Sequence, residues 1–234
     1  MSIKLRKIVW FSLGAAILIY ILTLSYQYFD SKSAYSLPLA GQMIVLDPGH
    51  GGRDGGAASQ SGVLEKDVTL TIAFYLRDLL EPSGAFVTMT RETDTELSSE
   101  ESRRKGQRKR EDLTNRVRLI NESDADFLVS IHLNSIPSPK WSGAQTFYDP
   151  SREENKRMAE LVQEELIRNL ENTNRQEKAT QDIFLLKHAQ IPGILVEAGF
   201  LSNPEEASLL NTEEYQKKVA LAIYMGILRY YGES

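Results

Sequence analysis

The chain has 234 residues, of which 41% are hydrophobic, and carries 27 lysines and arginines against 32 acidic residues, a net charge of −5. These values exclude a disordered or fibrous protein, favour one main globular domain, and argue against a nucleic-acid binder, which would usually be basic. There is no cysteine, so disulfides, thiolate catalysis and cysteine-bound metals are excluded. A transition metal would need Asp, Glu or the three histidines, His50, His132 and His188.

Residues 1–30 have the pattern of a signal peptide or signal anchor. No charge occurs within Ile8–Phe29, and a helix over this range would reach about 33 Å, the thickness of a bilayer core. The cations Lys4, Arg6 and Lys7 come first. The pattern predicts one transmembrane or signal helix and export of the remainder. Cleavage before Ala34 and retention as a membrane anchor are both open, and residues 31–42 have linker composition.

From residue 43, short apolar runs alternate with helical patterns. The predicted strands are Met43–Leu46, Phe86–Thr90, Phe127–Ile131, Ala144–Tyr148, Ile183–Leu186 and Ile194–Val196. Apolar stripes predict helices over Val68–Leu80, Leu113–Ile120, Met158–Leu170 and Tyr215–Ile227. Residues 43–234 are therefore expected to form one three-layer α/β domain with a mainly parallel sheet flanked by helices.

Two helix starts are marked by capping residues. Ser151 and Glu154 have the spacing of a capping box. Asn203 is followed by Pro204 and two acids, the order expected of a cap, a first-turn proline and an acidic first turn.

A charged stretch, residues 92–110, interrupts the alternation. It ends in a basic cluster, Arg103, Arg104, Lys105, Arg108, Lys109 and Arg110. So many cations cannot be buried together, which predicts a solvated loop or helix. It is either a plain surface excursion or a docking patch for an anionic wall polymer, a membrane surface or a partner.

A glycine-rich loop, Asp47-Pro48-Gly49-His50-Gly51-Gly52-Arg53-Asp54-Gly55-Gly56, follows the first predicted strand. Glycines at this density permit tight bends and close approach of a ligand to the backbone. A phosphate loop is disfavoured, because neither the Lys-Ser/Thr ending nor the dinucleotide-binding glycine spacing is present. His50 has no apolar neighbours in the sequence and is better interpreted as a ligand than as a core residue.

Other chemically useful side chains are expected near His50. His132 and Glu197 each end a predicted strand, and Glu65 begins the helix after the glycine loop. Strand carboxyl ends and helix amino ends meet at one edge of a parallel α/β sheet, where ligands bind. The sequence therefore predicts that these four residues converge.

Two histidines and one carboxylate form a zinc site that leaves a fourth position for water. His50, Glu65 and His132 would be the ligands, and Glu197 the general base. Asp54 or Asp67 could replace Glu65, since spacing alone does not separate them. Asp47 would orient a ligating histidine or simply end its strand. His188, which has no companion, is expected on the surface or in a groove.

Five motifs in order give the chain a family resemblance. They are Val45–Gly52, Glu65-Lys66-Asp67, Thr90-Arg91-x-x-Asp94, Ser130-Ile131-His132-x-Asn134-Ser135 and Val196–Asn203. Together they resemble the zinc-dependent N-acetylmuramoyl-L-alanine amidases of the Amidase_3 type, over about Met43 to Tyr231. The resemblance implies a six-stranded α/β fold, one zinc ion per chain on His50, Glu65 and His132, and catalysis by Glu197. It thereby selects Glu65 over the two aspartates.

The charged stretch departs from the family pattern, because Leu113 and Arg116 come later than usual. A short chain with this insertion and without wall-binding repeats is most similar to the amidases that spore-forming bacteria use on cortex peptidoglycan. The resemblance implies removal of stem peptides so that muramic-δ-lactam can form, in the space between the forespore membranes. The expected partners are peptidoglycan, the membrane through the N-terminal helix and an unidentified protein activator, with no nucleic acid.

Two alternatives remain at this point. A zinc metallo-exopeptidase would use the same chemistry but often binds two metals, so metal counting separates it from an amidase. A non-catalytic wall-binding or partner-dependent domain of the same fold is disfavoured by the complete set of ligands and base.

Overall fold

The computed structural model describes residues 10, 13–25 and 37–232, apart from the side chain of Arg103. The chain divides into two compact units, residues 1–37 and 38–234. In the first unit, residues 13–25 are helical. No helix in the described ranges has both the length and the apolar character needed to cross a bilayer. The N-terminal cations Lys4, Arg6 and Lys7 and the possible cleavage point before Ala34 lie outside the described residues.

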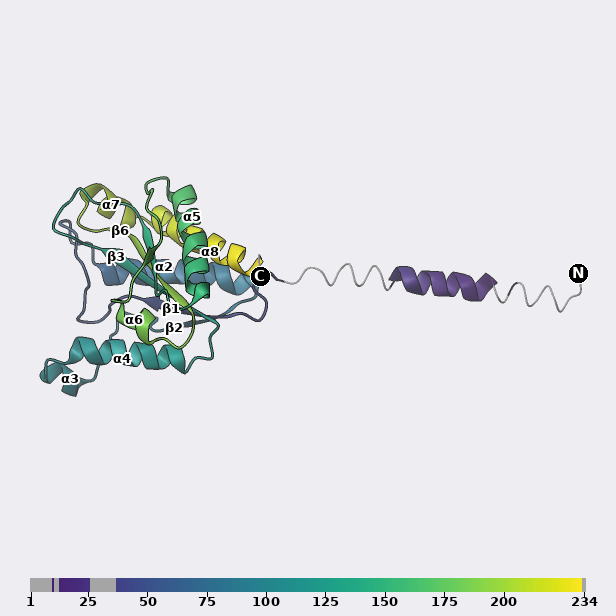
Figure 1. The fold of residues 1–234 in the computed structure, drawn as a ribbon, viewed down its shortest axis with the longest axis horizontal. Coiled ribbons are helices and arrows are strands. Elements are labelled where there is room, and N and C mark those ends of the chain that lie inside the picture. Colours follow the sequence, from purple (N-terminus) through teal and green to yellow (C-terminus); the bar gives the residue numbers. More distant parts are fainter. Residues whose placement is uncertain (1–9, 11–12, 26–36, 233–234) are drawn as a thin grey trace, which may run out of the picture. The chain divides into compact units, whose positions relative to one another are not determined.

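The second unit contains a six-stranded sheet in the order β2-β1-β3-β6-β4-β5 (Figure 1). Its strands are β1 (Met43–Pro48), β2 (Phe86–Met89), β3 (Phe127–Asn134), β4 (Gln145–Tyr148), β5 (Lys178–Ala179) and β6 (Gly193–Phe200). Strands β2, β1, β3 and β6 are parallel, whereas β4 is antiparallel to β6 and parallel to β5. The prediction of a mainly parallel, six-stranded sheet is confirmed.

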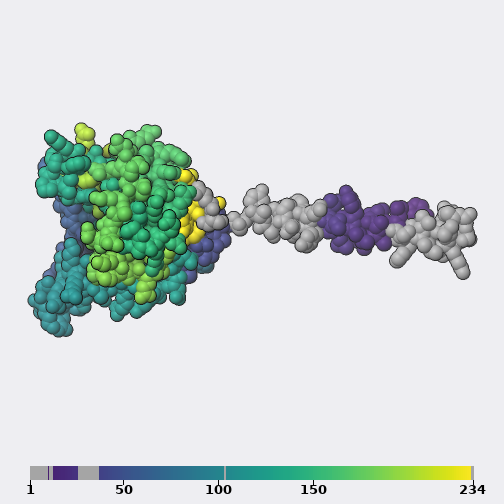
Figure 2. Space-filling model, viewed as in Figure 1, coloured from purple at the N-terminus to yellow at the C-terminus, as the bar shows by residue number. Residues whose placement is uncertain are grey.

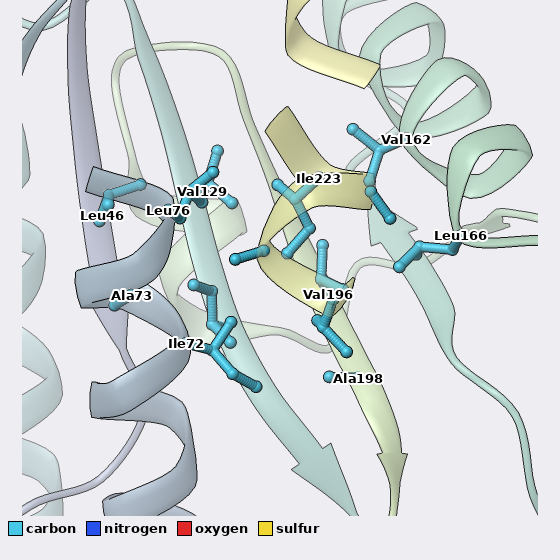
Figure 3. Packing of buried hydrophobic residues seen from close by; sticks show 14 of the residues in the cluster. Leu46, Ile72, Ala73, Leu76, Val129, Val162, Leu166, Val196, Ala198 and Ile223 are labelled. Atoms are coloured by element: carbon cyan, nitrogen blue, oxygen red, sulfur yellow. The ribbon is translucent and has the colours of Figure 1, made fainter. Parts of the chain in front are cut away.

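Helices cover both faces of the sheet, which gives three layers. The helical elements are α2 (Glu65–Leu80), η1 (Glu81–Ser83), α3 (Glu100–Arg104), α4 (Arg108–Asn121), α5 (Glu153–Leu170), α6 (Phe184–His188), α7 (Pro204–Leu210) and α8 (Glu213–Gly232). Val129 and Val196 of the central strands pack with α2, α5 and α8 (Figure 3). Their neighbours Leu128 and Leu195 pack with α4 and α6. Alternate strand residues point to opposite faces, so central strands covered on both sides are mostly apolar, and their polar residues gather toward the carboxyl edge.

The predicted strand Ile183–Leu186 is wrong. The segment forms the short helix α6, and the remaining strand of the sheet is β5. Leu185 and Leu186 are both buried in the same hydrophobic cluster. Successive residues of a strand would point to opposite faces, whereas a helix can direct both toward one layer. A short apolar run does not distinguish these two cases by periodicity.

The two predicted caps have different outcomes. The side chain of Asn203 accepts hydrogen bonds from the backbone N–H groups of Glu205 and Glu206, so the cap of α7 is confirmed. The capping box at Ser151 is wrong, because α5 begins two residues later, with Arg152 at the cap position and no side-chain cap. The backbone N–H of Ser151 donates instead to Asp149, so a local turn replaces the cap.

The charged stretch forms α3 and the start of α4, and projects from the lower left of the second unit in Figure 2. Arg104, Lys105, Lys109 and Arg110 are exposed, as the sequence predicts. Arg108 is partly buried and pairs with Glu96 at 2.7 Å. Lys105 pairs with Glu101 at 2.5 Å. Solvation and ion pairs with nearby acids thus accommodate the cationic cluster.

Candidate metal centre

The loop after β1 brings its backbone against the side chains of later elements. Gly49 packs so closely against the ring of His132 that a Cβ on it would lie 2.4 Å from Cε1. Gly56 has a φ of +68°, and a Cβ there would lie 2.5 Å from a carboxylate oxygen of Glu65. Both positions therefore require glycine. Between them, His50 has a φ of 62°, an uncommon backbone conformation for a residue with a side chain.

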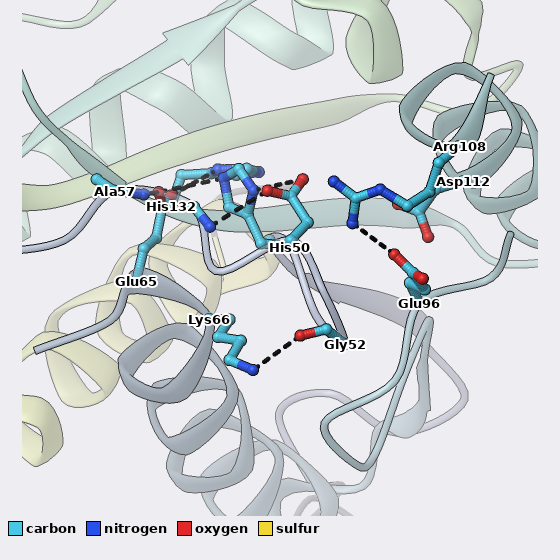
Figure 4. A network of polar contacts seen from close by, with 12 residues as sticks. His50, Gly52, Ala57, Glu65, Lys66, Glu96, Arg108, Asp112 and His132 are labelled. Carbon is cyan, nitrogen blue, oxygen red and sulfur yellow. Dashed lines mark hydrogen bonds and ion pairs between the residues drawn. The ribbon is translucent and has the colours of Figure 1, made fainter. Parts of the chain in front are cut away.

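Three predicted ligands, His50, Glu65 and His132, come together at the carboxyl edge of the sheet (Figure 4). The Nε2 atom of His50 lies 3.1 Å from Oε2 of Glu65, and Nδ1 of His132 lies 2.9 Å from Oε1. One potential ligand atom from each residue lies within 4.8 Å of the others. Glu65 is buried at the start of α2 and also accepts hydrogen bonds from the backbone N–H groups of Ala57 and Leu133.

The electrostatics of this group favour a cation. Burial opposes ionisation of Glu65, but the hydrogen bonds and charges of His132 and His50 outweigh it and lower the pKa of this carboxyl well below its usual value. Burial also lowers the pKa of His50, yet Glu65 and Asp54 raise it by more. A buried carboxylate between two imidazoles is a donor set that zinc accepts in hydrolases, so these residues fit the ion.

Asp54 and Asp67, the alternatives to Glu65 as the carboxylate ligand, do not lie between the two histidines. Asp54 Oδ2 lies 3.0 Å from Nδ1 of His50, the ring nitrogen not directed at Glu65. Asp54 can therefore fix the orientation and tautomer of this imidazole, as carboxylates beside metal-binding histidines do. Asp67 is exposed on the first turn of α2. His188 is exposed at the end of α6, as predicted, with its ring 4.3 Å from that of Phe184.

Glu197 lies beside these residues but outside the possible ligand group. In the sheet it is the direct neighbour of His132. Its Oε2 atom is buried and has no hydrogen-bond partner within the described part of the chain. Burial, helped by the charge of Glu65 and opposed by His132 and His50, raises the pKa of Glu197 to about 7. A carboxyl group with this pKa can accept a proton and return it near neutral pH.

Asp47 has a role that neither sequence interpretation included. It is buried, its Oδ1 lies 2.7 Å from Nη1 of Arg116, and it accepts hydrogen bonds from Thr90 and Ser130. Burial raises the pKa of this carboxyl, but Arg116, the two hydroxyls and the charge of His132 outweigh that and bring it to about 2. Asp47 therefore neutralises a buried arginine, where the prediction was a histidine partner or a plain strand end.

Most of the second unit, including this site, corresponds to a known family. Residues 44–229 match the sequence model described as N-acetylmuramoyl-L-alanine amidase. The chain belongs to this amidase family. A germination-specific N-acetylmuramoyl-L-alanine amidase of Bacillus subtilis is 52% identical over 230 residues, which cover 97% of each chain. The predicted resemblance is thus confirmed, and it favours an amidase over the exopeptidase and the non-catalytic domain.

Solved amidase structures share the fold. The CwlD amidase from Clostridioides difficile, determined in complex with the GerS lipoprotein, is 44% identical and superimposes with a TM-score of 0.80, covering 83% of this chain and 100% of that one. The amidase AmiC2 of Nostoc punctiforme is 32% identical with a TM-score of 0.71, covering 82% of this chain and 98% of that one.

Two buried arginines bind the backbone of the glycine loop of this amidase through hydrogen bonds to its carbonyl oxygens. Arg91 donates to the carbonyl oxygens of Pro48 at 3.0 Å and Gly49 at 2.9 Å. Arg116 donates to the carbonyls of Pro48 and His50. Reasoning from chemistry missed both roles, because the partners are backbone atoms far away in the sequence. The family resemblance was the available signal, since Arg91 belongs to one of its motifs and Arg116 to the pattern that follows the charged stretch.

A cavity of about 310 Å³ opens beside the site, within the size range of ligand pockets. Its lining includes His50, His132 and Glu197 at the sheet edge, and Lys109 and Leu113 of α4. Further lining residues, at α6, are Asp182, Ile183, Phe184 and Leu185. The cavity therefore lies between α4 and α6 and extends to Glu197.

Proposed function

We propose that this amidase hydrolyses the bond between the lactyl group of N-acetylmuramic acid and the L-alanine that begins the stem peptide, in spore cortex peptidoglycan. The observation that carries the proposal is Glu197, whose buried oxygen lacks a partner and whose pKa is about 7, beside three converging donors. The germination-specific name of the 52% identical relative supports the cortex as the substrate.

In this proposal, His50, Glu65 and His132 hold one zinc ion per chain. When bound, zinc polarises the amide carbonyl and lowers the pKa of the attacking water. Glu197 takes a proton from that water and delivers it to the L-alanine nitrogen as the C–N bond breaks, which leaves a lactyl carboxylate and a free amine. Asp54 keeps Nε2 of His50 directed toward Glu65 through its contact with Nδ1.

The proposal extends to the rest of the chain and to its location. Residues 1–30 act as a signal peptide or membrane anchor, 31–42 as a linker and 43–234 as the catalytic domain, with 92–110 as an insertion. The enzyme is exported and, in a spore-former, works between the forespore membranes. Removing the stem peptide from muramic acid there permits muramic-δ-lactam to form. A protein activator is also proposed, since the similar CwlD amidase was solved with a lipoprotein.

Mass spectrometry of muropeptides after digestion by the zinc-loaded enzyme tests the reaction. We expect new free L-alanine amino termini without new reducing sugar ends. Reducing ends without free amines would identify a glycosidase and overturn the proposal. Metal analysis should find about one zinc per chain, whereas two would support the exopeptidase.

Variants test the assigned roles. His50→Ala and His132→Ala should lose zinc, and Glu197→Ala should keep zinc but lose turnover. Full activity in Glu197→Ala would remove this residue from the mechanism. Activity that appears only after a partner protein is added would identify that partner as the activator.

A further inference from the structure

The cavity beside the candidate metal centre contains two cations with different surroundings. Arg116 is buried and neutralised, with Nε 2.8 Å from Asp112 and Nη1 2.7 Å from Asp47. Lys109 is exposed and lines the same cavity as Asp54, whose carboxylate feels its charge. Asp54 is itself engaged by His50, with Oδ2 3.0 Å from Nδ1, so Lys109 can still bind an anionic ligand in this cavity.

Lys109 also differs from its neighbours in the basic cluster. Arg108 is paired with Glu96. Arg110 lines a different cavity, between α3 and α4. Lys109 shares one face of α4 with Leu113 and Arg116, at the four- and three-residue spacing of a helix, and all three line the cavity at the metal centre. Within 108–110, Lys109 is thus the cation directed to the site.

Polar and apolar side chains line different parts of this cavity. Glu197 and the histidines are at its sheet edge, and Leu113, Ile183 and Phe184 supply apolar surface. Four aspartates also line it: Asp47 and Asp112 bind Arg116, Asp54 contacts His50, and Asp182 is exposed. A stem peptide that places its first amide at Glu197 would set small aliphatic groups, the lactyl and alanine methyls, against such a surface. The next residue, which is acidic in peptidoglycan, begins about 3.8 Å further along the chain. Lys109 is the exposed cation among the described residues that line this cavity.

Resting on the proposed function, we propose that Lys109 binds the free α-carboxylate of the acidic residue that follows L-alanine in the stem peptide. Lys109 is then a substrate-binding residue that makes the amidase prefer peptides with this carboxylate free over peptides with it amidated. This gives one residue of the charged insertion a function.

The test compares two muropeptides that differ only in this group, one with D-glutamate and one with D-isoglutamine as the second residue. For the zinc-loaded enzyme, kcat/KM is measured on both. Lys109→Ala should lower kcat/KM by about fivefold on the D-glutamate substrate, the scale of one exposed ion pair, and by less than about twofold on the amidated one. Lys109→Arg should retain the preference.

Arg110→Ala is the matched control, since it removes the adjacent exposed cation from the other cavity and should leave both rates nearly unchanged. Binding of the dipeptides L-alanyl-D-glutamate and L-alanyl-D-isoglutamine, measured by calorimetry, should show the same loss of preference in Lys109→Ala.

Equal losses on both substrates in Lys109→Ala would overturn the inference, because Lys109 would then act through the general field of the site. No loss on either would also overturn it. A parent enzyme that releases no L-alanine amine from either muropeptide would instead contradict the proposed function, so the two failures are distinguishable.

Discussion

Replacing Arg116 with methionine tests how the site is held together. The arginine side chain is only 2% exposed and binds Asp112, Asp47 and the carbonyls of Pro48 and His50. Methionine retains much of the apolar stem but removes every donor. Asp47 would then remain buried with hydrogen bonds from hydroxyl groups but without its cation.

The expected loss of stability is about 3 kcal/mol. Removing one partner of a buried ion pair typically costs about 3–5 kcal/mol, since it leaves an uncompensated charge. The pKa of Asp47, lowered from 3.8 to about 2, gives a second figure of about 2 kcal/mol at neutral pH, at about 1.4 kcal/mol per unit. The two figures agree in order of magnitude.

The pH dependence has a definite sign. Because the pKa of Asp47 is lowered on folding, its contribution is fully present above about pH 4 and is lost as pH falls through about 2. Without Arg116, burial dominates and raises the pKa of Asp47, so its charged form destabilises the fold. The stability difference between parent and Arg116→Met should therefore shrink as pH falls from 7 toward 4.

Urea unfolding at several pH values measures these differences, with zinc titration as a second readout for the His50 loop. The matched control is the double variant Asp47→Asn/Arg116→Met, which removes both charges and should be more stable than Arg116→Met alone by at least about 1 kcal/mol. If the double variant is equally stable or less stable, the buried charge of Asp47 is not the cause of the loss.

Three further predictions concern the site. Glu197→Gln should bind zinc normally but lose at least about 100-fold in kcat. Parent activity should fall as acidification protonates Glu197, whose pKa is about 7 without metal and is lowered by the charge of bound zinc; a pH-rate profile flat from neutral to acidic pH would contradict the base assignment. Gly49→Ala should weaken zinc binding, because the new Cβ would displace the His132 ring. Gly55→Ala is the control, since its Cβ would meet only a leucine methyl at 3.7 Å; equal zinc affinities of the two variants in a titration would refute this prediction. Chelation of zinc should lower the melting temperature of the parent and of Glu197→Gln by the same amount, because Glu197 is not expected to bind the ion. A smaller shift in the variant would indicate that Glu197 is a zinc ligand.

The position of the site could be predicted because it follows from a general rule of sheet geometry. His132 and Glu197 lie opposite each other toward the carboxyl ends of neighbouring parallel strands, and their place at one edge requires no knowledge of side-chain contacts. The choice among Glu65, Asp54 and Asp67 could not be made in this way. All three are near the same loop in sequence, and only the start of α2 brings one of them between both imidazoles.

Other features depend on contacts that no local pattern encodes. Arg91 and Arg116 act on backbone carbonyls of a loop separated from them by 42 to 68 residues. The wrong prediction of a strand at Ile183–Leu186 has a related cause. An apolar tetrapeptide becomes helix or strand according to the layer against which it packs. Tertiary packing decides in both cases, so sequence periodicity is insufficient.

One helix face serves both the candidate metal centre and the proposed substrate contact. Lys109 lies on the first turn of α4, while Arg116, two turns later, binds the carbonyl of His50. Because a helix transmits position rigidly over so short a distance, a shift of α4 would move the peptide-binding charge and the support of a metal ligand together. The charged insertion leads directly into this helix. Changes in the insertion that displace α4 should therefore affect substrate preference and zinc affinity in parallel, whereas Lys109→Ala should affect substrate preference alone.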